Sequence, residues 1–149
     1  MTLVGIVALI AALVISIALH ELGHMIPAKR FGVKVTQYMI GFGPTVWSRK
    51  RGDTEYGVKA VLLGGYIRMI GMFPPGPDGS VPASGNGRLG TLIEQARAES
   101  AAEIVEPGDE RRTFYNLTVP RKLVVMLGGP VMNLLLAIML FGIVFAGFG

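Results

Sequence analysis

Residues 3–24 read LVGIVALIAALVISIALHELGH, an apolar run that ends directly in two histidines and a glutamate. The run from Leu3 to Leu19 contains 17 residues without a charge, and its apolar character continues to about Ile26. A helix of this kind crosses about 30 Å of hydrocarbon at about 1.5 Å per residue. Because charged and metal-binding side chains at membrane depth cost a few kcal/mol each, we expect the histidines and the glutamate to serve chemistry.

The spacing of these side chains is that of a zinc site. His20 and His24 are four residues apart, so on a helix they share a face, with Cβ atoms about 6 Å apart, and both can reach one Zn²⁺. Glu21 projects beside the metal and can act as general base on a zinc-bound water, whose pKa the metal lowers to about 7. Gly23 leaves room for a substrate backbone. The alternative interpretation is a set of interfacial side chains that face lipid headgroups.

The composition is that of a small membrane protein. Hydrophobic residues make up 51% of the 149 residues, and the mean hydropathy of +0.53 is too apolar for an ordinary soluble domain. A second uncharged span runs from about Leu123 to Phe148. Met1-Thr2 carries no positive charge and no small-x-small site precedes the histidines, so the first span is expected to stay uncleaved. The predicted fold is α-helical, with two transmembrane helices and a membrane-associated β-rich segment between them.

The cations indicate an orientation in the membrane. All 14 Lys and Arg residues lie from Lys29 to Lys122, and several of them directly flank the two spans. The positive-inside rule therefore predicts a cytoplasmic connecting segment and both termini outside. Anionic lipid headgroups account for the net charge of +4, so no nucleic-acid partner is expected. The sequence has no cysteine, which excludes disulfides and thiolate ligands for zinc.

We predict four parts along the chain. They are the first transmembrane helix with the zinc motif, a β-rich membrane-associated segment, a flexible cytoplasmic loop, and an interfacial segment with the second helix, at residues 1–28, 29–72, 73–113 and 114–149. Within the loop, residues 73–90 are rich in Pro, Gly and Ser and read as a linker. Residues 92–102 are rich in Ala and Glu and predict a short polar helix.

The β-rich segment contains four β-like runs, at residues 33–40, 45–48, 54–60 and 61–70. The last run is almost continuously apolar, which favours a sheet that dips into the bilayer where protein or a wet cavity covers its backbone. The alternative is a small cytoplasmic β-meander at the membrane surface. A free edge strand near the zinc would hold an unwound substrate segment by strand addition.

The second span opens with the sequence Gly128-Gly129-Pro130-Val131-Met132-Asn133. The glycines and the proline favour close helix approach and a kink. Asn133 is the one strongly polar side chain in the span. It reads either as an interhelical hydrogen bond, worth about 1 kcal/mol, or as an amide near the zinc helix that orients substrate or supports the site.

Taken together, these motifs resemble the N-terminal part of a site-2 protease, a family of zinc intramembrane proteases. The matching motifs occur in the family's order and are His20-Glu21-Leu22-Gly23-His24, Gly41-Phe42-Gly43-Pro44, Gly64-Gly65-Tyr66-Ile67-Arg68-Met69 and Gly129-Pro130-Val131-Met132-Asn133. The resemblance covers nearly all of the chain and is strongest to the bacterial group with an extracytoplasmic PDZ domain. It implies a multi-pass protein of the bacterial inner membrane that cleaves transmembrane segments of regulatory proteins such as anti-sigma factors.

The resemblance also implies roles for individual residues. With Zn²⁺ as cofactor, these are the metal ligands His20 and His24, the catalytic Glu21, and the substrate-binding Asn133, Gly64 and Gly65. The family's third ligand is an aspartate in a Leu-Asp-Gly motif, and this sequence contains no such motif. Asp53, Asp78 and Asp109 lie in polar loops and are not expected to replace it. Further C-terminal helices or a partner chain are expected to supply that ligand.

Two functions of different classes follow. In the first, the chain is the N-terminal part of a zinc endopeptidase acting on a membrane-spanning protein. In the second, it is a non-catalytic membrane module that binds transmembrane helices, because the third zinc ligand is absent from the sequence.

Overall fold

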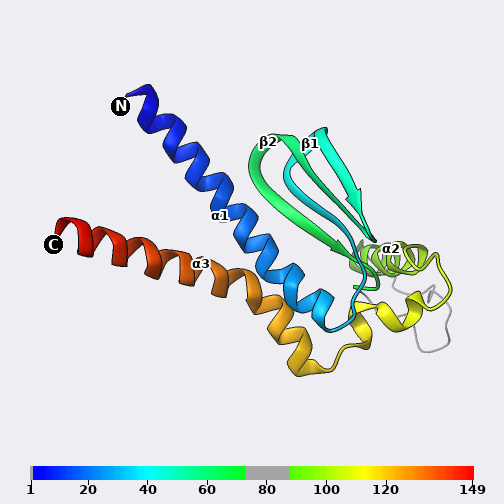
Figure 1. Cartoon of the computed structure of the whole chain (residues 1–149). Coiled ribbons are helices and arrows are strands. Elements are labelled where there is room, and N and C mark those ends of the chain that lie inside the picture. The colour runs from blue at the N-terminus through cyan, green and yellow to red at the C-terminus, as the bar shows by residue number, and fades with distance from the viewer. Residues whose placement is uncertain (1, 73–87) are drawn as a thin grey trace.

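The structure, a computed structural model, describes residues 2–72 and 88–149. The elements along the chain are α1 (Leu3–Arg30), β1 (Val35–Arg51), β2 (Thr54–Met69), α2 (Arg88–Ala102), two short 3-10 turns (Asp109–Arg112 and Phe114–Asn116) and α3 (Val119–Phe148). Figure 1 shows α1 and α3 converging at one end and diverging toward the two chain termini. The sheet of β1 and β2 stands beside α1, on the side away from α3 (Figure 1).

Helix α1 is stabilised at both ends by local chemistry. The backbone N–H of Gly5 donates to Thr2 Oγ1 at 3.4 Å, which caps the first turn. Lys29 and Arg30 lie in the last turn, where cations interact favourably with the helix dipole. Pro27 lies inside the helix and has no N–H, so the carbonyl of Gly23 loses its usual helical partner.

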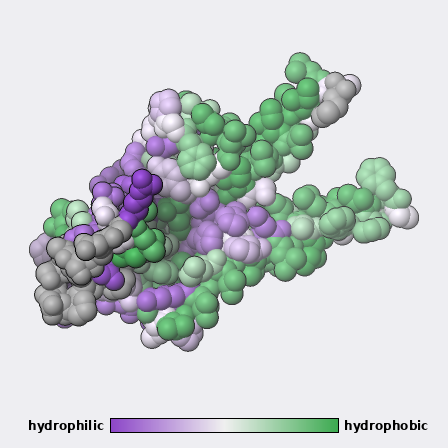
Figure 2. All heavy atoms as spheres, turned by 180° about the vertical axis from the view of Figure 1, so that it is seen from behind, coloured by the Kyte–Doolittle hydropathy of each residue, from purple (hydrophilic) through white to green (hydrophobic). Residues whose placement is uncertain are grey.

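Both long helices are apolar enough to cross a membrane by length and composition, as predicted. Their apolar side chains point outward along most of the length, from Leu3 at 76% exposed to Phe148 at 91%. Figure 2 shows this as two apolar arms, with hydrophilic atoms gathered where the arms converge. Exposed apolar surface of this extent suits helices that face lipid rather than water.

The sheet is built from two strands that both bend. β1 and β2 pair antiparallel, and Gln37, Tyr38, Met39 and Ile40 each have partners in both halves of β2. For example, Met39 pairs with Gly57 on one side and with Tyr66 on the other. The first half of β1 is therefore held between the two halves of β2. The prediction of four separate strands is wrong, because the positive-φ glycines Gly41 and Gly43 lie within β1 and do not end it.

A small core joins the elements where α1 and α3 converge. Its buried members come from the end of α1, the start of β1 and the residue pair before it, the end of β2, the second 3-10 turn and the start of α3. They are Met25, Ala28, Val33, Val35, Met69, Phe114 and Val125. The segment before α3 adds backbone bonds. Lys34 N–H donates to the Arg112 carbonyl at 2.9 Å, and Phe114 N–H donates to the Ile70 carbonyl at 3.0 Å. The second span thereby starts from a position fixed against the sheet.

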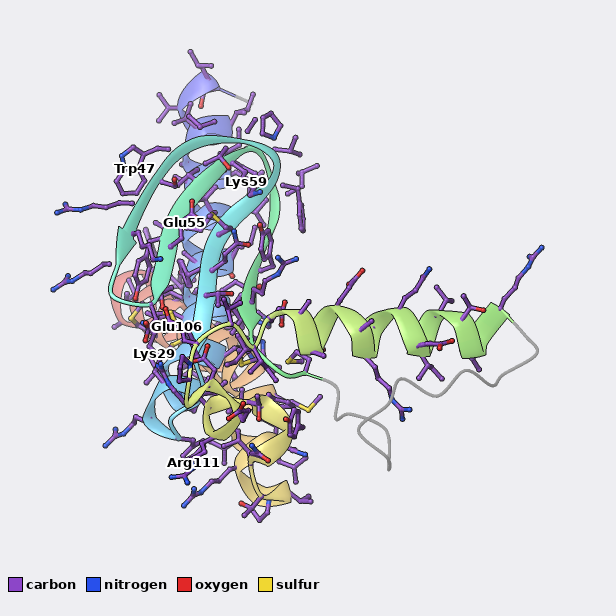
Figure 3. All side chains as sticks on the ribbon, turned by 90° about the vertical axis from the view of Figure 1, so that its right-hand side faces the viewer. Lys29, Trp47, Glu55, Lys59, Glu106 and Arg111 are labelled. Carbon is purple, nitrogen blue, oxygen red and sulfur yellow. The ribbon has the colours of Figure 1, made fainter. Side chains whose placement is uncertain are left out.

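Helix α2 covers the predicted polar helix at 92–102 and begins four residues earlier. It extends away from the two long helices (Figure 3). Most of the linker predicted at residues 73–90 lies outside the described residues. The interfacial segment predicted from residue 114 is a 3-10 turn, Phe114–Asn116, that leads directly into α3.

Candidate metal centre

His20 and His24 aim their Nε2 atoms at each other from successive turns of α1. The two Nε2 atoms are 3.3 Å apart, and the rings are nearly perpendicular at 79°. Two nitrogens at about 2.0–2.1 Å from one tetrahedral Zn²⁺ would be about 3.3–3.4 Å apart. The separation of the two donor atoms therefore fits joint coordination of a zinc ion.

The other nitrogen of each ring contacts α3. His24 Nδ1 donates to the carbonyl oxygen of Val125 at 2.7 Å, and Asn133 Nδ2 donates to His20 Nδ1 at 3.1 Å. Contacts of this kind fix the orientation of metal-binding histidines. Both rings are thus oriented by residues that lie more than a hundred positions further along the chain.

Gly129 borders the space between the two Nε2 atoms. A Cβ added there would lie 2.7 Å from His20 Nε2 and would also overlap His24 Nε2. Glycine is therefore required at this position if both lone pairs are to share one ion. The chemistry of the donors, their separation and the space beside Gly129 all fit Zn²⁺.

Glu21 faces the sheet rather than α3. A Cβ added at Gly65 of β2 would lie 3.1 Å from Glu21 Cγ and 3.0 Å from Ile17 Cγ2, so the β2 backbone passes directly beside Glu21. Tyr38 lies on the same side and donates its hydroxyl to the Ala18 carbonyl at 2.6 Å. The Glu21 side chain thus lies against the β2 backbone at Gly65.

An apolar cavity of about 210 Å³ opens beside His24. It is lined by the end of β2 and the start of α3, through His24, Ile67, Met69, Met72, Phe114, Val125 and Met126. A cavity of this size accommodates one apolar side chain next to the histidine pair.

The three predicted substrate-binding residues have different surroundings. Gly65 lies next to Glu21, and Asn133 contacts His20. Gly64 instead lies beneath Phe42, whose ring atoms a Cβ at position 64 would overlap, and Phe42 stacks on Tyr66 at 6.3 Å between centroids. Only Gly65 and Asn133 therefore contact residues of the predicted catalytic motif in this arrangement.

The acidic residues of the loops are engaged elsewhere. Asp109 lies 2.9 Å from Lys34 Nζ, and this hydrogen bond holds the pKa of the buried carboxyl below its ordinary 3.8. Arg112 bonds Asp53 at 2.8 Å and lowers the pKa of that carboxyl in the same way. Asp78 lies outside the described residues. Within residues 2–72 and 88–149, no group of three His, Cys, Asp or Glu side chains is arranged to hold a metal.

Two parts of the centre were not anticipated from the sequence, the Val125 carbonyl and the backbone at Gly129. A backbone carbonyl carries no signal in a sequence, because every residue has one. The Gly128-Gly129 pair does carry a signal for close helix approach, but not for which atoms it approaches.

Comparison with known proteins agrees with this geometry. The profile of peptidase family M50 matches residues 8–149. The zinc metalloprotease Rip1 of Mycobacterium tuberculosis is 39% identical over 140 residues, which cover 94% of this chain and 28% of that protein. The zinc metalloprotease Rip1 of Mycolicibacterium smegmatis is 34% identical over 141 residues, covering 92% of this chain and 28% of that protein. The chain thus spans 28% of the length of these relatives.

Proposed function

Because the chain belongs to peptidase family M50, we propose that it carries the metal-binding and general-base part of a zinc endopeptidase that works in or beside a lipid bilayer. The observation that carries the proposal is the 3.3 Å separation of His20 Nε2 and His24 Nε2, with each Nδ1 fixed from α3. The names of the relatives, which are zinc metalloproteases, support Zn²⁺ as the metal.

In this mechanism His20 and His24 would hold the ion through Nε2. When bound, Zn²⁺ supplies Lewis-acid activation of a water molecule and of the scissile carbonyl. Glu21 would be the general base that takes a proton from the attacking water and returns it to the leaving amine. Its position one residue after His20, facing β2, allows it to reach a peptide bound along the sheet without being a ligand.

The proposed substrate is a membrane-spanning protein, cleaved in an unwound part of its transmembrane segment. Residues 65–69 of β2 pair with β1 along one edge, and the opposite edge has no strand partner within the described residues. An extended peptide added to that edge would pass Gly65 and lie beside Glu21. The apolar cavity beside His24 supports an apolar substrate side chain near the scissile bond. Regulatory proteins such as anti-sigma factors are membrane-anchored proteins of this type.

The proposed location is the bacterial inner membrane, with several spans and a cytoplasmic segment between α1 and α3. The two helices that are long and apolar enough to cross a membrane support a membrane location. The bacterial origin of the relatives supports assignment of that membrane to a bacterial cell. The cations flanking both spans support the orientation.

The test is cleavage of a single-span substrate by the purified protein in vesicles, with Glu21→Gln beside the unchanged protein. We expect Glu21→Gln to lower the cleavage rate by about 10²-fold or more and to keep its zinc, because Glu21 is a base and not a ligand. His20→Ala and His24→Ala should lose both zinc and cleavage. Undiminished cleavage by Glu21→Gln would refute this mechanism.

The second candidate function is a non-catalytic membrane module that binds transmembrane helices. It is favoured by the two-histidine donor set, since the described residues supply no third metal ligand and catalytic zinc normally has three. Under the first function, further helices or a partner chain supply that ligand. Absence of zinc from the purified protein, together with binding but no cleavage of a substrate helix, would select the second function.

A further inference from the structure

Cations from three separate segments line one cavity at the C-terminal end of α1. The cavity has a volume of about 260 Å³, and its cations are Lys29 of α1, Arg51 at the end of β1 and Arg112 of the first 3-10 turn. Among the described residues that line it, Asp53 is the only acidic one. Three positive side chains against one negative side chain leave an excess of two positive charges at neutral pH.

The contacts of these side chains show where the excess charge lies. Arg112 forms an ion pair with Asp53 at 2.8 Å. Lys29 instead donates to the neutral hydroxyl of Tyr56 at 2.8 Å, and its Nζ lies 5.3 Å from the centroid of that ring. Arg51 forms no ion pair with any residue that the structure describes. The excess positive charge therefore belongs to Lys29, which Tyr56 holds in place, and to Arg51.

Two glycines leave the wall of the cavity open to a ligand. Gly32 and Gly52 both line it, with φ values of +85° and +63°, and an added Cβ at either position would meet nothing within 4 Å. Glycine adopts a positive φ without steric cost and lets a ligand approach the backbone closely. The cavity thus combines cationic side chains with backbone that no side chain covers.

The cavity lies at the level expected for lipid headgroups. Helix α1 has 28 residues and is about 42 Å long at 1.5 Å per residue, whereas the hydrocarbon core is about 30 Å thick and the bilayer with its headgroups about 40–45 Å. The last turn of α1 would therefore lie among headgroups. Ile26 precedes Lys29 by three residues, on the same side of the helix, and is 44% exposed. An acyl chain could pass along this side chain while its phosphate lies in the cavity.

We propose that this cavity binds the phosphate group of an anionic phospholipid, with Lys29 and Arg51 as its charged partners. Arg offers a planar set of donors to phosphate oxygens, and Lys offers a compact charge. Tyr56 is a positioning residue, because it holds the Lys29 ammonium without neutralising it. The inference rests on the proposed membrane location, but it depends neither on zinc nor on hydrolysis.

The test is native mass spectrometry of the whole chain in uncharged detergent, titrated with phosphatidylglycerol or with phosphatidylcholine of the same acyl chains. We expect tighter binding of phosphatidylglycerol. Lys29→Gln and Arg51→Gln should each weaken that binding by about fivefold, the effect of one cation at a membrane surface. Arg88→Gln removes the same charge at the start of α2, which extends away from the long helices, and should leave the affinity unchanged (Figure 3).

Asp53→Asn gives an expectation of the opposite sign. The substitution removes the one negative charge and frees the Arg112 guanidinium, so phosphatidylglycerol should bind about fivefold more tightly. Both side chains of this pair are partly exposed, at 41% and 46%, so its loss should cost the fold little. Weaker or unchanged binding by Asp53→Asn would overturn the inference, because a purely structural role of these charges predicts that result.

Three further results would overturn it. One is equal affinity for the two lipids, and another is unchanged affinity in both Lys29→Gln and Arg51→Gln. The third is displacement of phosphatidylglycerol by an equal concentration of soluble glycerol 1-phosphate, which would make the ligand a free phosphate ester and not a lipid. Failure of the unchanged protein to insert into lipid vesicles would overturn the proposed membrane location and this inference with it. Insertion without a preference for phosphatidylglycerol would overturn this inference alone.

Discussion

The carbonyl oxygen of Gly23 lies against the backbone of Gly128, and this contact sets how closely α1 and α3 cross. Pro27 contributes to the contact, because it lacks the N–H that would otherwise bond the Gly23 carbonyl within α1. A Cβ on either glycine would overlap the other helix. The crossing is what brings the Val125 carbonyl and Asn133 to the two histidines.

Alanine at Gly23 or Gly128 should therefore push the two helices apart. We expect each substitution to destabilise the helix pair by about 1–3 kcal/mol, as overpacking of a tight contact does, and to lower zinc occupancy. Gly142→Ala is the matched control, since an added Cβ there meets nothing within 4 Å. Thermal unfolding in detergent measures the effect, and equal midpoints for the Gly23→Ala, Gly128→Ala and Gly142→Ala variants would contradict the assignment of this contact.

The substitution Gly129→Ala should weaken zinc binding rather than separate the two helices. Its methyl group would lie in the space on which both Nε2 atoms converge, so we expect zinc affinity to fall by about 100-fold or more. Elemental analysis of the purified variant, beside Gly142→Ala, measures the zinc content. Full zinc occupancy in Gly129→Ala would mean that the zinc ion binds at a different place.

Gly65→Ala should affect cleavage without affecting zinc. The added methyl would lie about 3 Å from Glu21 Cγ, Ile17 Cγ2 and the Met39 carbonyl, so the β2 backbone must shift away from α1. Displacement of a bound substrate relative to Glu21 by a fraction of an ångström should lower kcat/KM by about tenfold. The measurement is cleavage kinetics together with zinc content, and a loss of zinc in this variant would indicate a different role for the contact.

The contacts that hold residues 106–115 against the two strands should depend on pH only at very low and very high pH. The pKa of Asp109 and that of Asp53 are held below 3.8 by Lys34 and Arg112, so their stabilisation is complete above that value and is lost as the pH falls through the lower folded-state pKa values. The pKa of Lys34 is raised above 10.5, chiefly by its hydrogen bond to Asp109, so its contribution is lost only as the pH rises beyond that value.

Hydrogen exchange of the Lys34, Ile70 and Phe114 amides, corrected for the intrinsic pH dependence, checks this behaviour. Protection should be constant between these two limits and should fall below pH 3.8 and above pH 10.5. In the variant Asp109→Asn, the same three amides should already show the lower protection at neutral pH. A transition near neutral pH in the unchanged protein would contradict the role of these ion pairs.

The sequence predicted the parts of the centre that depend on local spacing. His20 and His24 share a face because they are four residues apart on a helix, and this follows from the helical repeat alone. Long uncharged runs likewise predicted α1 and α3, since only length and polarity decide whether a segment can span a bilayer. Family membership then followed from the order of the motifs.

The parts that were missed depend on contacts between distant segments. Which carbonyl of α3 meets His24 depends on the rotation and height of one helix against the other, and Val125 differs from its apolar neighbours in no property that a sequence displays. The number of strands was wrong for a related reason. A glycine such as Gly41 permits a bend as readily as a turn, and the double pairing of Met39 depends on how the bent strands pack.

The partners of the two histidines on α3 also determine when the centre can form during biosynthesis. Val125 and Asn133 follow His24 and His20 by 101 and 113 positions, so a ribosome completes them long after α1 has entered the membrane. Until α3 has been inserted and docked, the Val125 carbonyl and Asn133 cannot orient the two imidazoles. A nascent chain would thus hold both histidines without their partners on α3, and the two-histidine centre would take this arrangement only after α3 has been made and has packed against α1.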